Sequence, residues 1–366
     1  MSPTLFPFFV KLCRIPMSLD QSTNALSDRY SRQMRFTPLG EAGQQRLAGA
    51  RVLVCGLGAL GSATASTLVR AGVGFVRVVD RDYLELSNLQ RQSLYDEQDV
   101  ASGLPKAIAA TRKLEAINSE MTIEGIVADV TAKNIDVLAG DVDVIVDGSD
   151  NFEIRFLIND FALARGIPWV YGGAIGAEGQ SITILPGETP CLACVLPEPP
   201  PAGVAPTCDT AGILAPAIQV VAAIQATEAL KLLSGNRQAV SRVWTIFDLW
   251  SNRIRQVDLA PLAGDGGCRA CGERDFTWLD GRRGSQSAIL CGRNAVQLRP
   301  ATSQGLDLAT LGGQLGGVGE VFQNDYLLRL EVPPYSLTLF PDGRAIVAGT
   351  DDEGVARGLF ARYVGN

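Results

Sequence analysis

The feature that most constrains the fold is a glycine-rich turn between an apolar run and a helical pattern. Residues 51–80 pass from RVLVC through Gly56, Gly58 and Gly61 into a helix-like segment, and then into a second apolar run that ends at Asp80. This order predicts a βαβ unit. Backbone amides at such a turn can hold a phosphate, and a carboxylate after the second strand can accept hydrogen bonds from a ribose. A turn that only packs a helix on a strand is the alternative.

Strand and helix patterns alternate through the following part of the chain. Helical spacing is found over 105–118, 151–166 and 212–235, and strand patterns are found over 142–150 and 167–176. Alternating strands and helices predict an α/β fold with a doubly wound, mostly parallel, Rossmann-like sheet.

The pattern changes after Cys271. Residues 272–287 mix charges with turn residues, which is typical of a linker. We therefore expect a disordered tail (1–27), a nucleotide-binding domain (28–284) and a small α+β domain (285–366). The order expected in the small domain is a strand (287–300), a helix (306–317), two strand segments (326–334 and 335–349, with a Pro-Asp-Gly hairpin turn) and a helix (351–365).

Composition excludes several classes of function. The chain has 32 Lys and Arg, 39 Asp and Glu and no His, which removes Ser-His-Asp hydrolysis, Cys-His proteolysis and His-ligated zinc catalysis. A net charge of −7 argues against nonspecific binding to nucleic acids or anionic membranes. No apolar run approaches the roughly 20 residues that span a bilayer, and the apolar start precedes Lys11 and Arg14 rather than following them. We expect a cytoplasmic protein.

A second group of residues favours a polyphosphate ligand. The segment SNLQRQ at 87–92 supplies Asn88 and Arg91, and Lys106 stands near the start of a predicted helix. The planar guanidinium of Arg91 can donate two parallel hydrogen bonds to a phosphate, and the ammonium of Lys106 supplies a compact positive charge. The first turn of a helix favours acidic residues, so a lysine there suggests a nearby anion. Ordinary solvated side chains are the alternative for each residue alone.

Two carboxylates follow the predicted strand at 142–147. Asp147 and Asp150 come at its carboxyl end, where ligands bind in open α/β sheets, and either one can hold Mg²⁺ beside phosphates. For Asp150 the alternative is a helix N-cap with Glu153 as its capping-box partner.

Cysteine spacing predicts a metal site. Two CxxC pairs in a chain without His have the composition of a closed, structural Cys₄ zinc site, with a pair of redox motifs as the alternative. Cys55 and Cys291 lie in predicted strands and are expected to be buried. Cys208 stands in a proline-rich passage before the long helix, where it is either a nucleophile or an inert loop thiol. The four predicted zinc ligands are Cys191, Cys194, Cys268 and Cys271.

Taken together, these motifs resemble the ThiF/MoeB adenylyltransferases, which are relatives of the ubiquitin-activating enzymes. The resemblance covers about residues 28–272 and rests on motifs in the family's order, which are RYSRQ, GLGALGS, SNLQRQ, GLPK, DGSDN and the two CxxC pairs. Enzymes of this family use ATP to adenylate the C-terminal Gly-Gly carboxylate of a small β-grasp sulfur-carrier protein, which then receives sulfur as a thiocarboxylate.

The resemblance implies roles for individual residues and therefore implies ATP, Mg²⁺ and Zn²⁺ as cofactors. It assigns Asp80 to the ATP ribose, Asn88, Arg91 and Lys106 to the phosphates, and Asp150 to Mg²⁺. The two CxxC pairs match the family's zinc ligands.

The resemblance also implies partners. Arg32 matches an arginine that reaches into the active site of the other subunit, so a homodimer is expected, and Cys208 matches a cysteine on a loop that crosses the active site. Larger members end in a sulfur-delivering rhodanese domain, but residues 285–366 are too short for one, so a separate sulfurtransferase is a further candidate partner.

Two other classes of function are considered. An NAD-dependent oxidoreductase needs only the glycine turn and Asp80, but it leaves SNLQRQ unexplained. A catalytically inactive scaffold for a β-grasp protein does not account for the full set of phosphate-binding residues. None of those residues lies in 285–366, so the sequence alone predicts that removing this domain spares adenylation.

A first prediction concerns sulfur transfer. We expect Cys208→Ser to retain exchange of labelled pyrophosphate into ATP but to slow or stop thiocarboxylate formation on the carrier, because adenylation requires no thiol. Unchanged thiocarboxylate formation, followed by intact mass, would rule out a Cys208 relay, whereas loss in Cys291→Ser with retained folding would move the role to the small domain.

Overall fold

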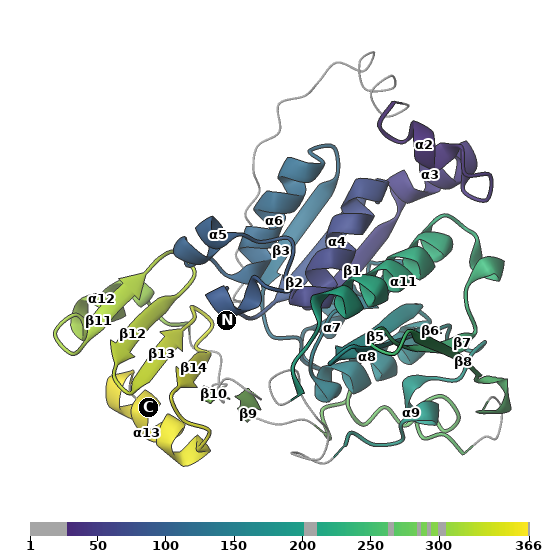
Figure 1. Ribbon diagram of the computed structural model, residues 1–366. Helices are drawn as coiled ribbons and strands as arrows, with labels where there is room; N and C mark the ends of the chain where they lie inside the picture. The colour runs from purple at the N-terminus through teal and green to yellow at the C-terminus, as the bar shows by residue number, and fades with distance from the viewer. Residues whose placement is uncertain are drawn as a thin grey trace, which may run out of the picture.

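The computed structural model describes residues 28–200, 211–262, 267–283, 287–290, 294–298 and 305–364. The predicted tail at 1–27, Cys208 and Cys291 lie outside the described residues. Two sheets organise the chain, a larger one with helices on both faces and a smaller one formed by the C-terminal segment (Figure 1).

The larger sheet is a doubly wound sheet with an antiparallel extension. Its strand order is β3-β2-β1-β4-β5-β6-β7-β8. The first five strands along the chain pair in parallel, which confirms the predicted fold class. The sequence patterns did not indicate the antiparallel extension from β6 to β8. The strands are β1 (Arg51–Cys55), β2 (Phe75–Asp80), β3 (Thr122–Val127), β4 (Val144–Asp147), β5 (Trp169–Ile175), β6 (Glu178–Ile184), β7 (Val243–Asp248) and β8 (Arg253–Asp258).

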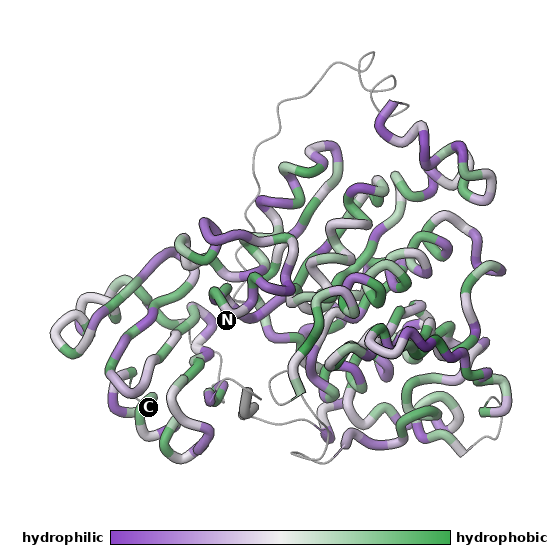
Figure 2. The backbone as a smooth tube through the Cα atoms, viewed as in Figure 1, coloured by the Kyte–Doolittle hydropathy of each residue, from purple (hydrophilic) through white to green (hydrophobic). Residues whose placement is uncertain are grey.

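Alternate residues of the central strands point to opposite faces of the sheet and pack into two separate hydrophobic cores. In β1, Val52 and Val54 pack with the helices on one face, and Leu53 and Cys55 pack with those on the other. Burial on both faces explains why these strands are apolar throughout. Figure 2 shows apolar residues recurring along the helices that cover the sheet. One face carries α3 (Gly40–Gly49), α4 (Ala59–Ala71), α6 (Lys106–Ile117) and α11 (Ala215–Leu233), and the other carries α7 (Ile135–Ala139), α8 (Phe152–Arg165) and α9 (Leu192–Val195).

The glycine turn after β1 requires glycine at two positions for different reasons. Gly56 has a φ of +90°, a region that side chains disfavour. A Cβ on Gly61 would lie 1.8 Å from the Gly56 carbonyl oxygen, so only glycine lets α4 begin this close to β1. A Cβ on Gly58 would meet its nearest neighbouring atom at 4.0 Å, so the turn is open on that side.

The small C-terminal sheet is antiparallel throughout, in the order β11-β12-β13-β14-β10-β9. The segment expected as one strand at 287–300 is a pair of strands, and β11 was not expected. The predicted Pro-Asp-Gly turn does join β13 to β14. The elements are β9 (Ser287–Leu290), β10 (Ala295–Leu298), α12 (Leu308–Leu315), β11 (Glu320–Gln323), β12 (Leu328–Val332), β13 (Tyr335–Leu339), β14 (Ala345–Ala348) and α13 (Glu353–Tyr363).

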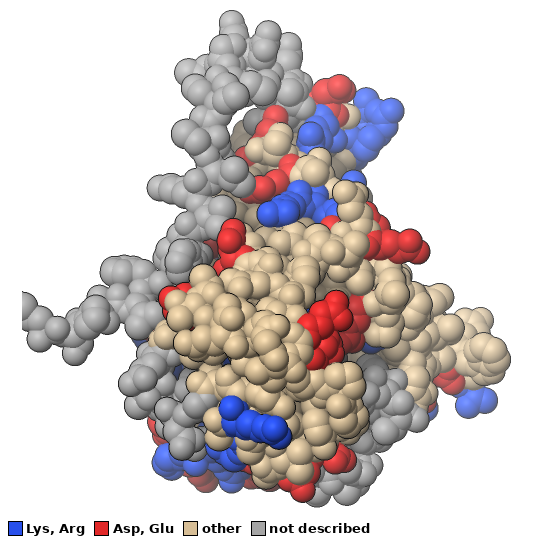
Figure 3. Space-filling model, turned by 90° about the vertical axis from the view of Figure 1, so that its left-hand side faces the viewer, with Lys and Arg blue, Asp and Glu red and all other residues tan. Residues whose placement is uncertain are grey.

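The two faces of this small sheet have different partners. One face packs against α12 and α13 in a core of its own. The other packs Ala295, Leu327, Phe340 and Ile346 against Tyr83 of the larger domain. Figure 3 views the molecule from the left-hand side of Figure 1, and most of the described surface there is uncharged apart from separate acidic and basic clusters. The small domain is therefore docked on the segment that follows β2.

No helix in the described part of the chain has the length and apolar composition needed to cross a membrane.

Candidate active site and metal centre

Asp80, at the end of β2, is hydrogen-bonded to the glycine turn. Its Oδ2 accepts from the backbone N–H of Leu57 at 2.6 Å, and its Oδ1 accepts from the N–H of Asp82 at 2.7 Å. Burial raises the pKa of Asp80, and the nearby Lys106 ammonium opposes that rise. Each carboxylate oxygen has a second lone pair, so the group can still accept from a ribose.

Lys106 lies at the start of α6 with only 3% of its surface exposed. Its Nζ is 3.3 Å from Oδ2 of Asp82, and its backbone N–H donates to the Asp82 carbonyl at 2.8 Å. The hydroxyl of Tyr95 lies 3.0 Å from the Leu57 carbonyl oxygen and 3.5 Å from that of Lys106. A buried ammonium is thus held beside the glycine turn. Sequence reasoning missed both Asp82 and Tyr95, although Asp82 follows Asp80 in the same post-strand segment.

The segment SNLQRQ lies against the same turn. Asn88 is buried and accepts from the N–H of Glu85 at 3.2 Å, while Arg91 is half-buried and donates to the Ser87 carbonyl at 2.8 Å. Nε2 of the buried Gln92 is the atom that a Cβ on Gly58 would meet at 4.0 Å. Of this segment, the structure places the Gln92 side-chain amide at the open side of the turn.

Asp147 forms a buried ion pair that stabilises the fold, so the prediction that it can bind Mg²⁺ is wrong. The side chain is fully buried. Its Oδ1 accepts from the N–H and the hydroxyl of Ser149 at 2.9 and 2.6 Å, and its Oδ2 lies 3.2 Å from Nε of the buried Arg155. Burial raises the pKa of Asp147, and Arg155 opposes the rise. Its lone pairs are used by hydrogen bonds and an ion pair within the fold, so Asp150 is the remaining candidate metal ligand after β4.

Asp150 is exposed just beyond β4. The alternative that made it an N-cap is wrong, because α8 is capped by Asn151, whose Oδ1 accepts from the N–H of Glu153 at 2.7 Å. Among the described residues, Asp150 has no hydrogen-bond partner. Its carboxylate stands at the carboxyl ends of the strands, within electrostatic reach of Arg81 and Arg155.

Arg32 lies at the opposite edge of the sheet. It is exposed on α2 (Ser31–Met34), and the adjacent Gln33 donates to the Ala71 carbonyl at 2.9 Å, shortly before the amino end of β2. Strands of this length span roughly 17–20 Å, so the side chain cannot reach the glycine turn of its own chain (Figure 1). Any role at an active site requires a second subunit.

The two CxxC pairs meet although they are far apart in sequence. Cys191 and Cys194 at α9 lie beside Cys268 and Cys271, and all four Sγ atoms are within 4.8 Å of one another. The separations of 3.8, 3.7 and 3.3 Å are close to the roughly 3.8 Å between thiolates around a tetrahedral zinc with Zn–S bonds of about 2.3 Å. Hydrogen bonding from Cys194 lowers the pKa of Cys191 to about 5. The donor set fits a Cys₄ zinc site.

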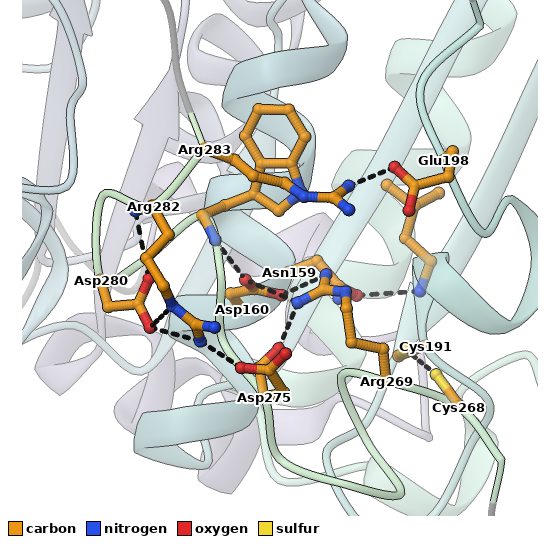
Figure 4. A network of polar contacts seen from close by, with 12 residues as sticks. Asn159, Asp160, Cys191, Glu198, Cys268, Arg269, Asp275, Asp280, Arg282 and Arg283 are labelled. Atoms are coloured by element: carbon orange, nitrogen blue, oxygen red, sulfur yellow. Dashed lines mark hydrogen bonds and ion pairs between the residues drawn. The ribbon is translucent and has the colours of Figure 1, made fainter.

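A polar network fixes the second CxxC pair to α8 (Figure 4). Arg269, between the two cysteines, lies 3.2 Å from Oδ1 of the fully buried Asp160, which also accepts from the N–H of Trp278 at 3.0 Å. The neighbouring Asn159 accepts from the N–H of Leu192 at 2.9 Å, which holds the first pair on the same helix. Sequence reasoning missed both α8 residues, because neither belongs to a motif.

Comparison with protein families decides the classification. The model of the ThiF family matches residues 30–270. The chain belongs to the ThiF family. Within it, the sulfur carrier protein ThiS adenylyltransferase of Bacillus subtilis (strain 168) is 47% identical over 341 residues, which are 93% of this chain and 100% of that protein.

Other comparisons separate the ThiF-family region from the C-terminal domain. A sulfur carrier protein adenylyltransferase of Thermus thermophilus is 39% identical over 248 residues, which are 65% of this chain and 91% of that protein. The crystal structure of E. coli MccB with ATP superposes with a TM-score of 0.58 at 22% identity, covering 67% of this chain and 74% of that one. This last likeness is one of fold.

A second prediction tests the metal centre. Cys191→Ser is expected to lower zinc content and melting temperature together, because a closed Cys₄ site stabilises the fold through its metal. Cys55→Ser is the control, since Cys55 is a buried cysteine of β1 outside the cluster, and it should keep its zinc. Zinc is measured by atomic emission. Wild-type protein that is fully stable without zinc would contradict the prediction.

Proposed function

We propose that this protein adenylates the C-terminal Gly-Gly carboxylate of a small β-grasp sulfur-carrier protein with ATP, preparing it for thiocarboxylate formation. The observation that carries the proposal is the buried ammonium of Lys106 beside the glycine turn and Asp80. A buried cation at a helix start is costly, and Asp82 and Asp80 already offset part of the Lys106 charge; a bound polyphosphate would offset it further. The names of the relatives from B. subtilis and T. thermophilus support the same activity.

The proposed roles follow from the chemistry of each group. A carboxylate oxygen of the carrier attacks the α-phosphorus of ATP, a P–O bond to pyrophosphate breaks, and an acyl adenylate forms. Lys106 and Arg91 offset the repulsion between these anions, while Asn88 and the turn amides orient the phosphates and Asp80 binds the ribose. No proton is transferred in this step, so the reaction does not require a His as an acid or a base. Asp150 would hold Mg²⁺, which supplies further charge neutralisation on the phosphates.

The remaining parts of the proposal concern the assembly. The Cys₄ cluster binds Zn²⁺ as a structural ion, since four thiolates leave no open position for a substrate. The active form is a cytoplasmic homodimer, with sulfur supplied by a separate sulfurtransferase. The carrier would serve thiamine, molybdopterin or related sulfur metabolism.

The deciding experiment is exchange of labelled pyrophosphate into ATP by the purified protein with a Gly-Gly-ended carrier. Exchange that depends on the carrier supports adenylation. Absence of exchange, together with NAD-dependent turnover, would favour the oxidoreductase alternative, and binding of the carrier without exchange would favour an inactive scaffold.

A third prediction separates the two aspartates after β4. Asp150→Asn should abolish adenylation and leave the melting temperature near that of the wild type, because Asp150 is exposed and is not a cap. Asp147→Asn should instead lower stability by roughly 3–5 kcal/mol, since it weakens the buried pair with Arg155. Pyrophosphate exchange and thermal denaturation measure the two effects. Normal exchange by Asp150→Asn would remove the proposed Mg²⁺ ligand.

A fourth prediction tests whether Arg32 acts on the partner subunit. Arg32→Ala and Asp150→Asn homodimers should both be inactive, and a mixture of the two should recover part of the exchange activity. Each mixed dimer has one site with both groups intact, because Arg32 lies at the edge opposite the glycine turn. Lack of recovery after verified subunit exchange would place Arg32 outside the mechanism.

A further inference from the structure

The C-terminal domain contacts the segments that carry the proposed ATP-binding residues. Gln297 of β10 is fully buried and its Nε2 donates to Oδ2 of Asp129 at 2.9 Å. Oδ1 of the same carboxylate lies 3.3 Å from Nη1 of Arg81, the residue directly after Asp80. A side chain of the small domain is thus linked to the end of β2 through a single buried carboxylate.

Two more side chains of the small domain contact the residues that follow Asp80. The Arg329 guanidinium lies 4.3 Å from the centre of the Tyr83 ring, and Nη1 of the buried Arg344 lies 3.5 Å from the Arg81 carbonyl oxygen. Tyr83 also forms a backbone bridge to Pro105, the residue before Lys106. The apolar face of the small sheet covers the same ring.

A separate anchor lies just before α6. Nδ2 of Asn324 donates to the Gly103 carbonyl at 3.1 Å, and Oδ1 of Asn324 accepts the N–H groups of Tyr326 and Leu327. Gly103 has a φ of +60°, and a Cβ there would lie 2.6 Å from the Phe322 ring. The small domain therefore holds both segments that converge on Lys106, one from Arg81 and one from Gly103.

We propose that the C-terminal domain sets the affinity for ATP by holding residues 81–83 and 103–106 in their binding conformation, with Gln297 and Asn324 as positioning residues. This rests on the proposed function, because it takes Asp80 and Lys106 as ATP-binding groups. It replaces the expectation, drawn from sequence alone, that the domain is dispensable for adenylation. The domain acts through the backbone of these segments and contributes no group to the nucleotide.

The test uses full-length variants that keep the shape of each side chain. Gln297→Leu removes the donor to Asp129, and Asn324→Asp keeps the Oδ1 acceptor while removing the donor to Gly103. Thr338→Val is the matched control. Thr338 is fully buried on β13, at alternate positions with Phe340 on the side facing the larger domain, and its hydroxyl has no hydrogen-bond partner in the described structure.

We expect Gln297→Leu and Asn324→Asp each to raise the dissociation constant of Mg-ATP, measured by calorimetry without carrier, by about tenfold. The KM for ATP in pyrophosphate exchange should rise by the same factor, with kcat and the KM for carrier within about twofold of wild type. Thr338→Val should match the wild type in every value.

Two results for the variants would overturn the inference. If Gln297→Leu and Asn324→Asp bind ATP as tightly as Thr338→Val, the domain does not set ATP affinity. If kcat falls with no change in ATP binding, the domain acts elsewhere. Should one variant fail to fold, the other tests an independent anchor. Failure of the wild type itself to bind ATP or to exchange pyrophosphate would instead overturn the proposed function, and this inference with it.

Discussion

A close approach of three glycines fixes the position of the proposed site. A Cβ on Gly61 would lie 1.8 Å from the Gly56 carbonyl oxygen, and a Cβ on Gly148 would lie 2.6 Å from the same oxygen. The start of α4, the turn after β1 and the end of β4 therefore touch with no side chain between them. This contact aligns the carboxyl ends of β1, β2 and β4, so the turn amides, Asp80 and Asp150 share one edge of the sheet.

Buried charge at that edge is of two kinds. Asp147 and Arg155 neutralise each other, and Ser149 donates to Asp147 through both its N–H and its hydroxyl, so this carboxylate stabilises the fold and has little capacity left for a ligand. Lys106 is paired with Asp82 at 3.3 Å and stands at a helix start, where the helix dipole disfavours its charge. A polyphosphate would add charge neutralisation for Lys106 and none for the Asp147–Arg155 pair, and for this reason the proposed function rests on Lys106.

Local patterns predicted the elements that local forces determine. The parallel strands β1, β2, β4 and β5 and the helices α4, α6, α8 and α11 follow from apolar periodicity, whereas the partly buried edge strand β3 was not predicted. The two CxxC pairs converge as their composition predicted. The pattern left the cap of α8 open, with Asp150 as one candidate, and the structure assigns it to Asn151, one residue later. Contacts such as that between Gln297 and Asp129, which are 168 residues apart, were beyond prediction because tertiary packing alone brings them together.

The C-terminal domain covers a surface of the larger domain that contains an aromatic ring and a buried carboxylate. The match to the T. thermophilus relative covers 91% of that protein but only 65% of this chain. That relative is therefore too short to contain a C-terminal domain of this size. Here, however, Asp129 and Tyr83 are each only 6% exposed, and both are covered by the small sheet. Without it, an aromatic ring would face water and Asp129 would lose its amide donor beside Arg81. Because Arg81 directly follows Asp80, this loss would destabilise the segment that leads into the proposed nucleotide site.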